Sequence, residues 1–346
     1  APQAAVERLA RMIRLKDIAE QAGVSVMTVS KALRDEPDIA NATKARIQAI
    51  ADQAGYVPNH AARGLRTRST QQFALIISAL TNPLYTRVIM AIEEQAHELG
   101  YEILFAQTLN NPEREERVIR RMIARQVDGL FIRPVYRPDN TAAIYDELKQ
   151  RGIPTVILGH RALFCSEFPN VQTDDLAAAH TATQHLLDLG HARIACFAGP
   201  TFSPWAQERY EGYRRALSDA EHEVDEKLVF HAGGTIEEGE KAALQLINER
   251  PGATAIVAAN DLVAIGAANV LLDQGLKIPT DISIVGFGDI LNAENYRIPL
   301  TTIDQPKYRR GVASMESMTA LLEGNSGSSK RLAAELIIRE STAPPA

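Results

Sequence analysis

Apolar residues recur at helical spacing near the start of the chain. The first set falls at positions i, i+3, i+4 and i+7: Leu15, Ile18, Ala19 and Ala22. This spacing predicts one buried face of a short helix. Gly23 then ends the helix, because a tight turn here needs a residue that tolerates a positive φ. Ser25 is placed to cap a second helix, whose inward residues are Val29, Ala32 and Leu33.

A third helical pattern starts near Asn41 and ends at Gly55, and its inward residues are Ile47, Ile50, Ala51 and Ala54. Three short helices with a glycine turn between the first two are typical of a helix-turn-helix DNA reader, whose second helix enters the major groove. Periodicity alone also fits an amphipathic helical hairpin with a solvated polar face. The outward residues of the second helix suit contacts with base edges and phosphates: Val26, Met27, Thr28, Ser30 and Lys31.

Beyond residue 72, short apolar strands alternate with amphipathic helical segments. Strands are predicted to begin near eight positions: Phe73, Glu102, Asp128, Pro154, Arg193, Lys227, Thr254 and Asp281. This βα repetition implies parallel sheets. Both a closed (β/α)₈ barrel and a pair of open doubly wound sheets fit eight such units. The irregular stretch from Arg161 to Val171 divides the series into two sets of four and favours two lobes.

The charge distribution separates the two parts further. The 346 residues are 45% hydrophobic and 23% charged, which excludes a disordered or fibrous chain, and their formal net charge is −6. Residues 1–68 hold 11 Lys and Arg against 7 Asp and Glu, so this head carries +4 and the other 278 residues carry −10. A basic head on an acidic body predicts two modules with different partners, with phosphates attracted to the head alone.

Other features narrow the setting of the protein. The longest apolar run, Phe73 to Leu80, is about half of the roughly 18 residues of a membrane span. Residues 1–14 form an N-terminal extension that lacks the apolar stretch of a secretory signal. Two cysteines, Cys165 and Cys196, are too few for a disulfide framework or a metal cluster and fit a reducing cytoplasm. We therefore expect a cytoplasmic protein without a metal or cofactor.

Two segments identify a family. The sequence LKDIAEQAGVSVMTVSKAL at 15–33 and the sequence GYVPNHAARGLR at 55–66 closely resemble the N-terminal region of the LacI/GalR family of bacterial transcription regulators. The resemblance implies a helix-turn-helix domain at 15–58 and, at 59–71, a hinge helix and linker that wedges Leu65 into the minor groove. A helix of about eight residues is unstable alone, which fits folding on DNA. The implied DNA contacts are Lys16, Ser25, Val26, Met27, Thr28, Ser30, Lys31, Asn59, His60, Arg63, Leu65 and Arg66.

The resemblance continues through the body, for example in VDGL at 127–130, RYEGY at 209–213 and PLTTI at 299–303. It implies an α/β core of two doubly wound lobes, similar to periplasmic binding proteins, over 72–346. Lobe 1 is expected at 72–169 plus 301–328, and lobe 2 at 170–300 plus 329–346. The family further implies a homodimer on palindromic operator DNA, with a sugar-like effector between the lobes. Its effector contacts match Tyr85, Arg133, Gly159, Arg209, Asn260, Gly288 and Gln305.

Two positions depart from the family pattern and bear on the effector. Sugar-responsive members often have a carboxylate where Gly288 stands, and they often have a neutral residue near Arg133. A more positive pocket would suit an anionic effector such as a sugar acid. In the alternative, Arg133 turns away to pair with Asp139 or another acid, and the effector is neutral. Trp205 either stacks on a sugar ring or packs in the core, and Asp261 is expected to cap a helix.

Enzyme motifs are absent: the chain has no P-loop, no GxSxG and no HExxH. His180, His185 and His191 are interpreted as structural histidines rather than metal ligands. The remaining alternatives to a transcription repressor are a (β/α)₈ sugar-metabolising enzyme with a helical N-terminal extension and a sugar-binding module without DNA activity. The C-terminus has no leucine heptads that would predict a coiled-coil tetramer.

Overall fold

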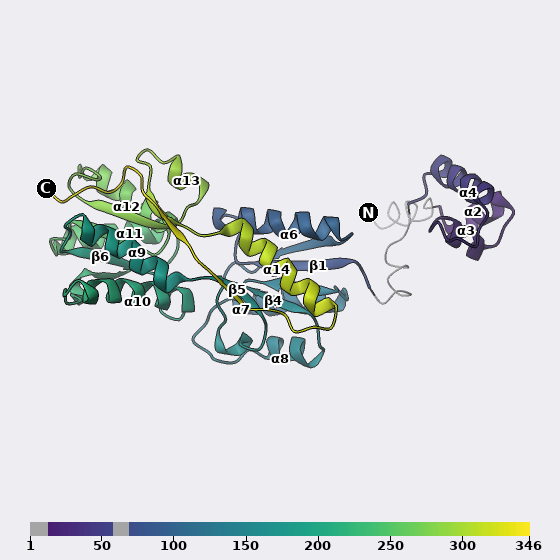
Figure 1. Cartoon of the computed structure of the whole chain (residues 1–346), viewed down its shortest axis with the longest axis horizontal. Coiled ribbons are helices and arrows are strands. Elements are labelled where there is room, and N and C mark those ends of the chain that lie inside the picture. Colours follow the sequence, from purple (N-terminus) through teal and green to yellow (C-terminus); the bar gives the residue numbers. More distant parts are fainter. Residues whose placement is uncertain (1–12, 58–68) are drawn as a thin grey trace, which may run out of the picture. The chain divides into compact units, whose positions relative to one another are not determined.

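The computed structural model describes residues 13–57 and 69–346, which fall into two compact units, a helical head and an α/β core. The head contains α2 (Leu15–Ala22), α3 (Val26–Ala32) and α4 (Asn41–Ala54) (Figure 1). Gly23 and Gly55 end α2 and α4 in the left-handed region, with φ of 64° and 66°. The predicted helix-turn-helix is confirmed, and its three helices meet on the fully buried Ile18, Val29 and Ile47.

The first lobe of the core is a six-stranded sheet with helices on both faces. Its strand order is β11-β5-β4-β3-β1-β2, and all its strand pairs are parallel. One face is covered by α6 (Thr86–Glu98) and α14 (Lys307–Leu322), and the other by α7 (Pro112–Ala124) and α8 (Ala143–Gln150). The strands are β1 (Gln72–Ile77), β2 (Glu102–Gln107), β3 (Gly129–Ile132), β4 (Thr155–Leu158), β5 (Asn170–Thr173) and β11 (Lys330–Leu332).

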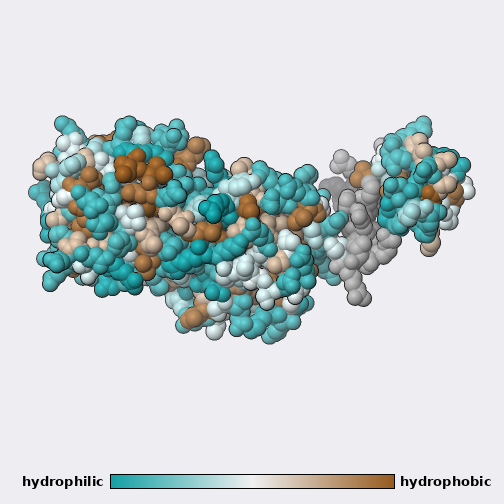
Figure 2. Space-filling view, in the orientation of Figure 1, coloured by the Kyte–Doolittle hydropathy of each residue, from teal (hydrophilic) through white to brown (hydrophobic). Residues whose placement is uncertain are grey.

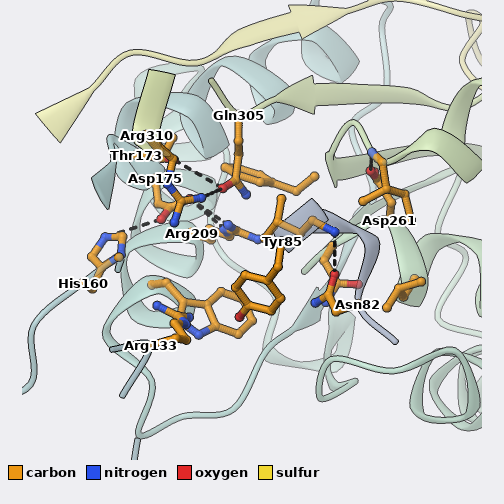
Figure 3. A pocket seen from close by; sticks show the side chains of 17 residues that line it. Asn82, Tyr85, Arg133, His160, Thr173, Asp175, Arg209, Asp261, Gln305 and Arg310 are labelled. Carbon is orange, nitrogen blue, oxygen red and sulfur yellow. Dashed lines mark hydrogen bonds and ion pairs between the residues drawn. The ribbon is translucent and has the colours of Figure 1, made fainter. Parts of the chain in front are cut away.

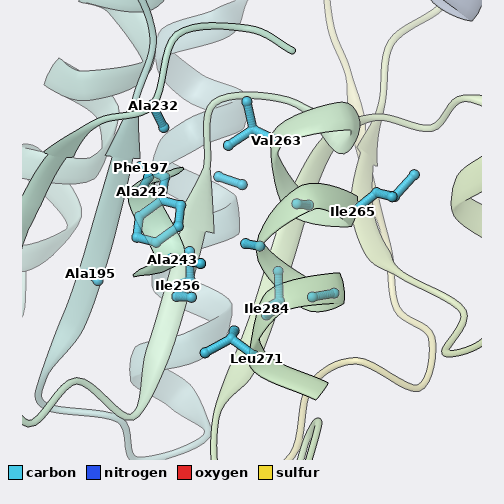
Figure 4. Close-up of a cluster of buried hydrophobic side chains, with 14 of the residues drawn as sticks. Ala195, Phe197, Ala232, Ala242, Ala243, Ile256, Val263, Ile265, Leu271 and Ile284 are labelled. Carbon is cyan, nitrogen blue, oxygen red and sulfur yellow. The ribbon is translucent and has the colours of Figure 1, made fainter. Parts of the chain in front are cut away.

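The second lobe has a similar plan, with strand order β12-β10-β9-β8-β6-β7, but its edge strand β12 is antiparallel to β10 while its other strand pairs are parallel. Helices α9 (Asp175–Asp188) and α10 (Pro204–Asp219) cover one face, and α11 (Ile236–Glu249) and α12 (Asp261–Asp273) cover the other. Figure 4 shows the core beneath α11 and α12, where Phe197 and Ile284 of the sheet meet Val263 and Leu271. The strands of this lobe are β6 (Ile194–Ala198), β7 (Val229–His231), β8 (Ala255–Ala258), β9 (Ser283–Gly288), β10 (Thr301–Asp304) and β12 (Glu335–Ile337). The core also has four short helical elements: η1 (Pro83–Tyr85), η2 (Leu163–Cys165), η3 (Glu226–Leu228) and α13 (Leu291–Glu294).

The eight predicted strands are all present, but the expected lobe boundaries are wrong by a few residues. β5 pairs with β4 in lobe 1, although 170–173 was expected in lobe 2. β10 pairs with β9 in lobe 2, although 301–304 was expected in lobe 1. The chain crosses after β5, after β10 and between β11 and β12. The short strands β5 and β10 are partly polar, so the pattern of apolar residues in the sequence does not reveal them. Only their pairing with a neighbouring strand defines them.

The three histidines on or after α9 have structural roles, as expected. His180 lies 2.9 Å from Asp219, and His185 lies 3.0 Å from Thr342. His191 is buried, with Nδ1 2.9 Å from Thr254 Oγ1 and Nε2 2.9 Å from the carbonyl oxygen of Ala343. The contacts of His185 with Thr342 and of His191 with Ala343 attach the C-terminal segment to lobe 2.

Candidate functional site

Helix α3 presents apolar side chains to solvent in its first turn. Ser25 caps the helix, because its Oγ accepts a hydrogen bond of 3.1 Å from the backbone N–H of Thr28. The cap fixes the direction of the first turn, in which Met27 is 70% exposed and Val26 44% exposed. The exposed surfaces of Met27 and Val26 are available to meet thymine methyl groups.

Some of the other expected DNA contacts lie in the described head, and the rest lie outside the described residues. Lys31 forms an ion pair with Asp38, and Ser30 accepts a 2.7 Å hydrogen bond from Arg34, so both residues have partners within the head. Lys16 is exposed, with Glu20 3.8 Å away. The remaining expected contacts lie outside the described residues: Asn59, His60, Arg63, Leu65 and Arg66.

A cavity lies between the two lobes of the core. The carboxyl ends of parallel strands face it from both lobes, which is where open α/β sheets bind ligands. Six of the seven expected effector positions line it: Tyr85, Arg133, Gly159, Arg209, Asn260 and Gln305. Figure 3 labels Tyr85, Arg133, Arg209 and Gln305 among them. Gly288 does not line it, and its carbonyl accepts a hydrogen bond of 2.8 Å from Lys307 instead.

Arg209 is held rigidly in the lobe 2 wall. Its Nε and Nη2 lie 3.0 and 2.8 Å from one carboxylate oxygen of Asp175, and Nη1 donates to the carbonyl of Ala259 at 2.5 Å. The guanidinium lies 3.5 Å from the ring centre of Phe287 and 4.7 Å from that of Trp205. Trp205 therefore lines the cavity and also stacks on an arginine. This wall combines aromatic faces with directed donors, as sugar sites do.

The lobe 1 wall carries two further arginines. Nη1 of Arg133 donates to Tyr136 Oη at 2.6 Å, and no ion pair with Asp139 occurs among the described residues. Nη1 of Arg310 donates to Gln305 at 2.9 Å. Burial alone would raise the pKa of Tyr85, but the positive charges of Arg133 and Arg310 and a hydrogen bond from Ser78 hold it below its ordinary value.

The expectation for Asp261 is wrong, because its neighbour caps the helix. Asn260 Oδ1 accepts from the N–H of Val263 at 2.9 Å and begins α12. The Asp261 carboxylate lines the cavity and accepts hydrogen bonds from the Ile290 N–H at 2.9 Å and from Thr302 Oγ1 at 2.5 Å. Burial, opposed by these hydrogen bonds, raises the pKa of Asp261 to about 6.

A polar cluster joins the two lobes at the edge of the cavity. His160 follows β4 in lobe 1, and its Nε2 lies 3.1 Å from Glu208 of α10 and 3.4 Å from Asp175 of α9. Arg331 of β11 lies 2.7 Å from Glu208 and 2.9 Å from Asp174. Burial would raise the pKa of Glu208, but His160 and Arg331 hold it below its ordinary value. These contacts tie lobe 1 to lobe 2.

Sequence reasoning missed several cavity residues: Asn82, His160, Thr173, Asp175, Phe287 and Arg310. Asn82 follows β1, and Thr173 is the last residue of β5. The positions of the strand ends could therefore have suggested both residues. Arg310 lies within α14, where only the packing of that helix against lobe 1 brings it to the cavity.

Across 13–57 and 69–346, no group of three or more His, Cys, Asp or Glu residues is arranged to hold a metal ion. Over the same residues, none of the helices combines the length and the apolar character that crossing a bilayer requires.

The chain belongs to the LacI family. The family profile described as bacterial regulatory proteins of the lacI family matches residues 14–59, and that of periplasmic binding proteins and the sugar-binding domain of the LacI family matches residues 70–340. The protein is therefore a DNA-binding transcription regulator of this family and not an enzyme. The two separate open sheets likewise exclude the (β/α)₈ barrel.

Known proteins resemble the chain over 80% to 96% of its length. The HTH-type transcriptional repressor CytR of Escherichia coli strain K12 is 34% identical over 330 residues, covering 95% of this chain and 96% of CytR. The Lac repressor dimer bound to operator and the anti-inducer ONPF superposes with a TM-score of 0.85 at 26% identity, covering 96% and 99% of the two chains. A sugar-binding LacI-family regulator from Escherichia coli, complexed with phosphate, has a TM-score of 0.69 and 27% identity, covering 80% and 100%.

Proposed function

We propose that this protein is a cytoplasmic transcriptional repressor that binds a palindromic operator as a homodimer and responds to a sugar-like effector between its lobes. The exposed Val26 and Met27 on a capped recognition helix carry the DNA-binding part of this proposal. Two heads related by a two-fold axis read two half-sites, so the operator has the symmetry of the dimer.

Exposed apolar side chains support the homodimer. Leu291 of α13 is 76% exposed, and Figure 2 shows apolar side chains gathered on the surface around α12 and α13. In lobe 1, Met90 of α6 and Phe105 of the edge strand β2 are 43% and 39% exposed. Apolar surface of this kind is typical of protein interfaces. The Lac repressor, which the core resembles, is a dimer on its operator.

The effector acts by preferring one arrangement of the two lobes. Because the cavity wall comes from both lobes, a ligand there has different contacts in a closed and an open arrangement, and this difference in affinity shifts the population. The state of the lobes then controls the separation of the paired hinges and the Leu65 wedges. A sugar acid is favoured over a neutral sugar, because Arg133 is not neutralised by Asp139.

The Leu65→Ala substitution tests the DNA-binding part. Selection of random duplexes by the full-length protein first yields the operator, which we expect to be an inverted repeat. Mobility shifts should then show that Leu65→Ala loses specific binding by tenfold or more, about 1.4 kcal/mol, while non-specific binding changes little. Met27→Ala is a comparison that weakens base contact without touching the wedge. Selection of no inverted repeat, or equal loss of specific and non-specific binding, would contradict the proposal.

A further inference from the structure

The cavity holds more positive charge than its own carboxylates neutralise. Three guanidinium groups line it, on Arg133, Arg209 and Arg310. Asp175 forms its ion pair with Arg209, and Asp261 accepts from a backbone N–H and a threonine hydroxyl. Among the described residues, no carboxylate lies within ion-pair distance of Arg133 or Arg310. Buried guanidinium groups without a counter-ion are costly, because the hydrogen bonds of Arg133 to Tyr136 and of Arg310 to Gln305 replace only part of the lost hydration and neutralise no charge.

Of Arg133 and Arg310, Arg310 gives the stronger evidence for an anionic ligand. Its side chain is on α14 and only 6% of the residue is exposed, yet its Nε is buried without a hydrogen-bond partner in the structure. One of its other nitrogens is used by Gln305. Burial and the neighbouring charge of Arg133 lower the pKa of Arg310, although it stays fully protonated at neutral pH. This N–H is a buried donor without a partner, on a side chain that lines the cavity, and a buried donor of this kind needs an acceptor.

The two free guanidinium groups lie beside each other over Gly159. A Cβ atom at Gly159 would collide with Nη1 of Arg133 and would lie 3.8 Å from Nη2 of Arg310. Gly159 has a φ of +106° and no Cβ, and the Arg133 guanidinium occupies the space where a Cβ would lie. Two like charges held this closely repel each other, and an anion placed between them removes that repulsion and accepts hydrogen bonds from both.

We propose that Arg310 and Arg133 form a seat on lobe 1 for one oxyanion group of the effector, either a carboxylate or a phosphate ester. This inference rests on the proposed function, which places the effector in the same cavity. The seat fixes the orientation of the ligand: its charged end contacts lobe 1, and its ring or polyol end lies toward Trp205, Phe287 and Asn260 of lobe 2. An anionic ligand then bridges the lobes, whereas a neutral analogue leaves both guanidinium groups unpaired.

The closing experiment compares Arg310→Gln with Arg309→Gln in the full-length protein. Arg309 precedes Arg310 on α14 but is exposed, so it is a matched control of the same residue type. The probes are inorganic phosphate against sodium chloride of equal ionic strength, followed by D-gluconate, D-glucose 6-phosphate and D-glucose in calorimetric titrations. We expect phosphate to raise the Tm saturably in wild type and in Arg309→Gln but not in Arg310→Gln.

For the sugars, we expect one anionic probe to bind wild type at least about tenfold more tightly than glucose, and Arg310→Gln to remove that preference. Preference for gluconate identifies a carboxylate, and preference for glucose 6-phosphate identifies a phosphate ester. Phosphate that stabilises wild type no better than chloride would overturn the seat, as would equal affinity for glucose and both anions or an Arg310→Gln variant that keeps the preference.

Two further measurements separate a binding role from a structural one. Ligand-free Arg310→Gln should unfold at the same temperature as wild type or a higher one, because the variant removes a buried unpaired charge; a purely structural Arg310 predicts a lower Tm. Arg310→Lys keeps the charge without the planar fork and should bind the anion with intermediate affinity. Operator binding by the wild-type protein is scored separately. A wild type that binds no operator refutes the proposed function, whereas a wild type that binds its operator but does not prefer an anion refutes the seat alone.

Discussion

Gly159 shows how one missing side chain makes room for Arg133 at the cavity wall. Its φ of +106° is a conformation that residues with a Cβ rarely adopt, and the space where a Cβ would lie is occupied by the guanidinium of Arg133. The same backbone position accepts a 2.9 Å hydrogen bond at its carbonyl from Asn170, which holds the β4 turn against β5. The residue is therefore required both for the turn and for the position of Arg133.

Gly159→Ala should separate these two requirements when compared with Gly152→Ala. Gly152 also has a positive φ, of 63°, but no atom lies within 4 Å of where its Cβ would be. Both variants should lose about 1 kcal/mol from backbone strain. Only Gly159→Ala should also displace Arg133 and lose the Tm shift with phosphate. Equal phosphate-induced shifts in the two variants would contradict the close contact with Arg133.

Several residue-level roles were readable from the sequence and others were not. The sequence correctly predicts that Gly23 ends α2 and that Ser25 caps α3, because capping and helix termination depend on neighbours within a few positions of the chain. Asp261 was misassigned because Asn260, one position earlier, is an equally good capping residue. The orientation of Asp261 depends on Ile290 and Thr302, which are distant in the sequence.

At the scale of elements, the C-terminal segment is attached to lobe 2 through a buried histidine. Because a carbonyl only accepts, Nε2 of His191 donates to Ala343, and Nδ1 accepts from the hydroxyl of Thr254. Burial lowers the pKa of His191 and outweighs the hydrogen bond to Ala343. The folded state thus keeps a neutral imidazole at pH values where the unfolded chain binds a proton.

Lobe 2 should therefore lose stability on acidification. The contribution of His191 is fully present above its ordinary pKa of 6.5 and is lost as the pH falls through the lower folded value. His191→Gln should lose about 1–3 kcal/mol at pH 8, because buried polar partners are left imperfectly paired, and should show a shallower decline between pH 7 and 5. Urea denaturation across this range measures both quantities. A His191→Gln variant with the same pH slope as wild type would refute the assignment of this pH dependence to His191. The His185→Gln variant is tested in parallel, because burial also lowers the pKa of His185.

At the scale of the whole core, the lobes are joined by three crossings of the chain and by side chains that reach across the cavity. Glu208 of lobe 2 contacts both His160 and Arg331 of lobe 1. Arg331 is 43% exposed, so solvent screens its ion pair, and its contribution to the free energy of unfolding is below about 1 kcal/mol. The contact between Glu208 and Arg331 affects the equilibrium between closed and open lobes more than it affects the free energy of unfolding.

Glu208→Gln should weaken effector binding with little change in stability, and Glu211→Gln is the matched control. Glu211 is on the same helix, but its partners Arg214 and Arg215 also belong to α10, so its pairs do not join the lobes. We expect Glu208→Gln to lower the affinity for the anionic probe several-fold and to increase the radius of gyration of the core in small-angle scattering. Identical behaviour of the two variants would contradict the role of Glu208 in closure.

The sequence alone determined the three-helix head, the eight principal strands, the parallel sheets and six of the positions that line the cavity. These features depend on local spacing, on caps and turns, or on motifs that the family keeps together, and all of them are encoded over short stretches of chain. Tertiary structure decided the lobe membership of β5 and β10, the cap at Asn260 and the arrival of Arg310 at the cavity. Each of these depends on which distant element lies alongside, because hydrogen-bond partners and counter-charges are set by contacts in space and not by position along the chain.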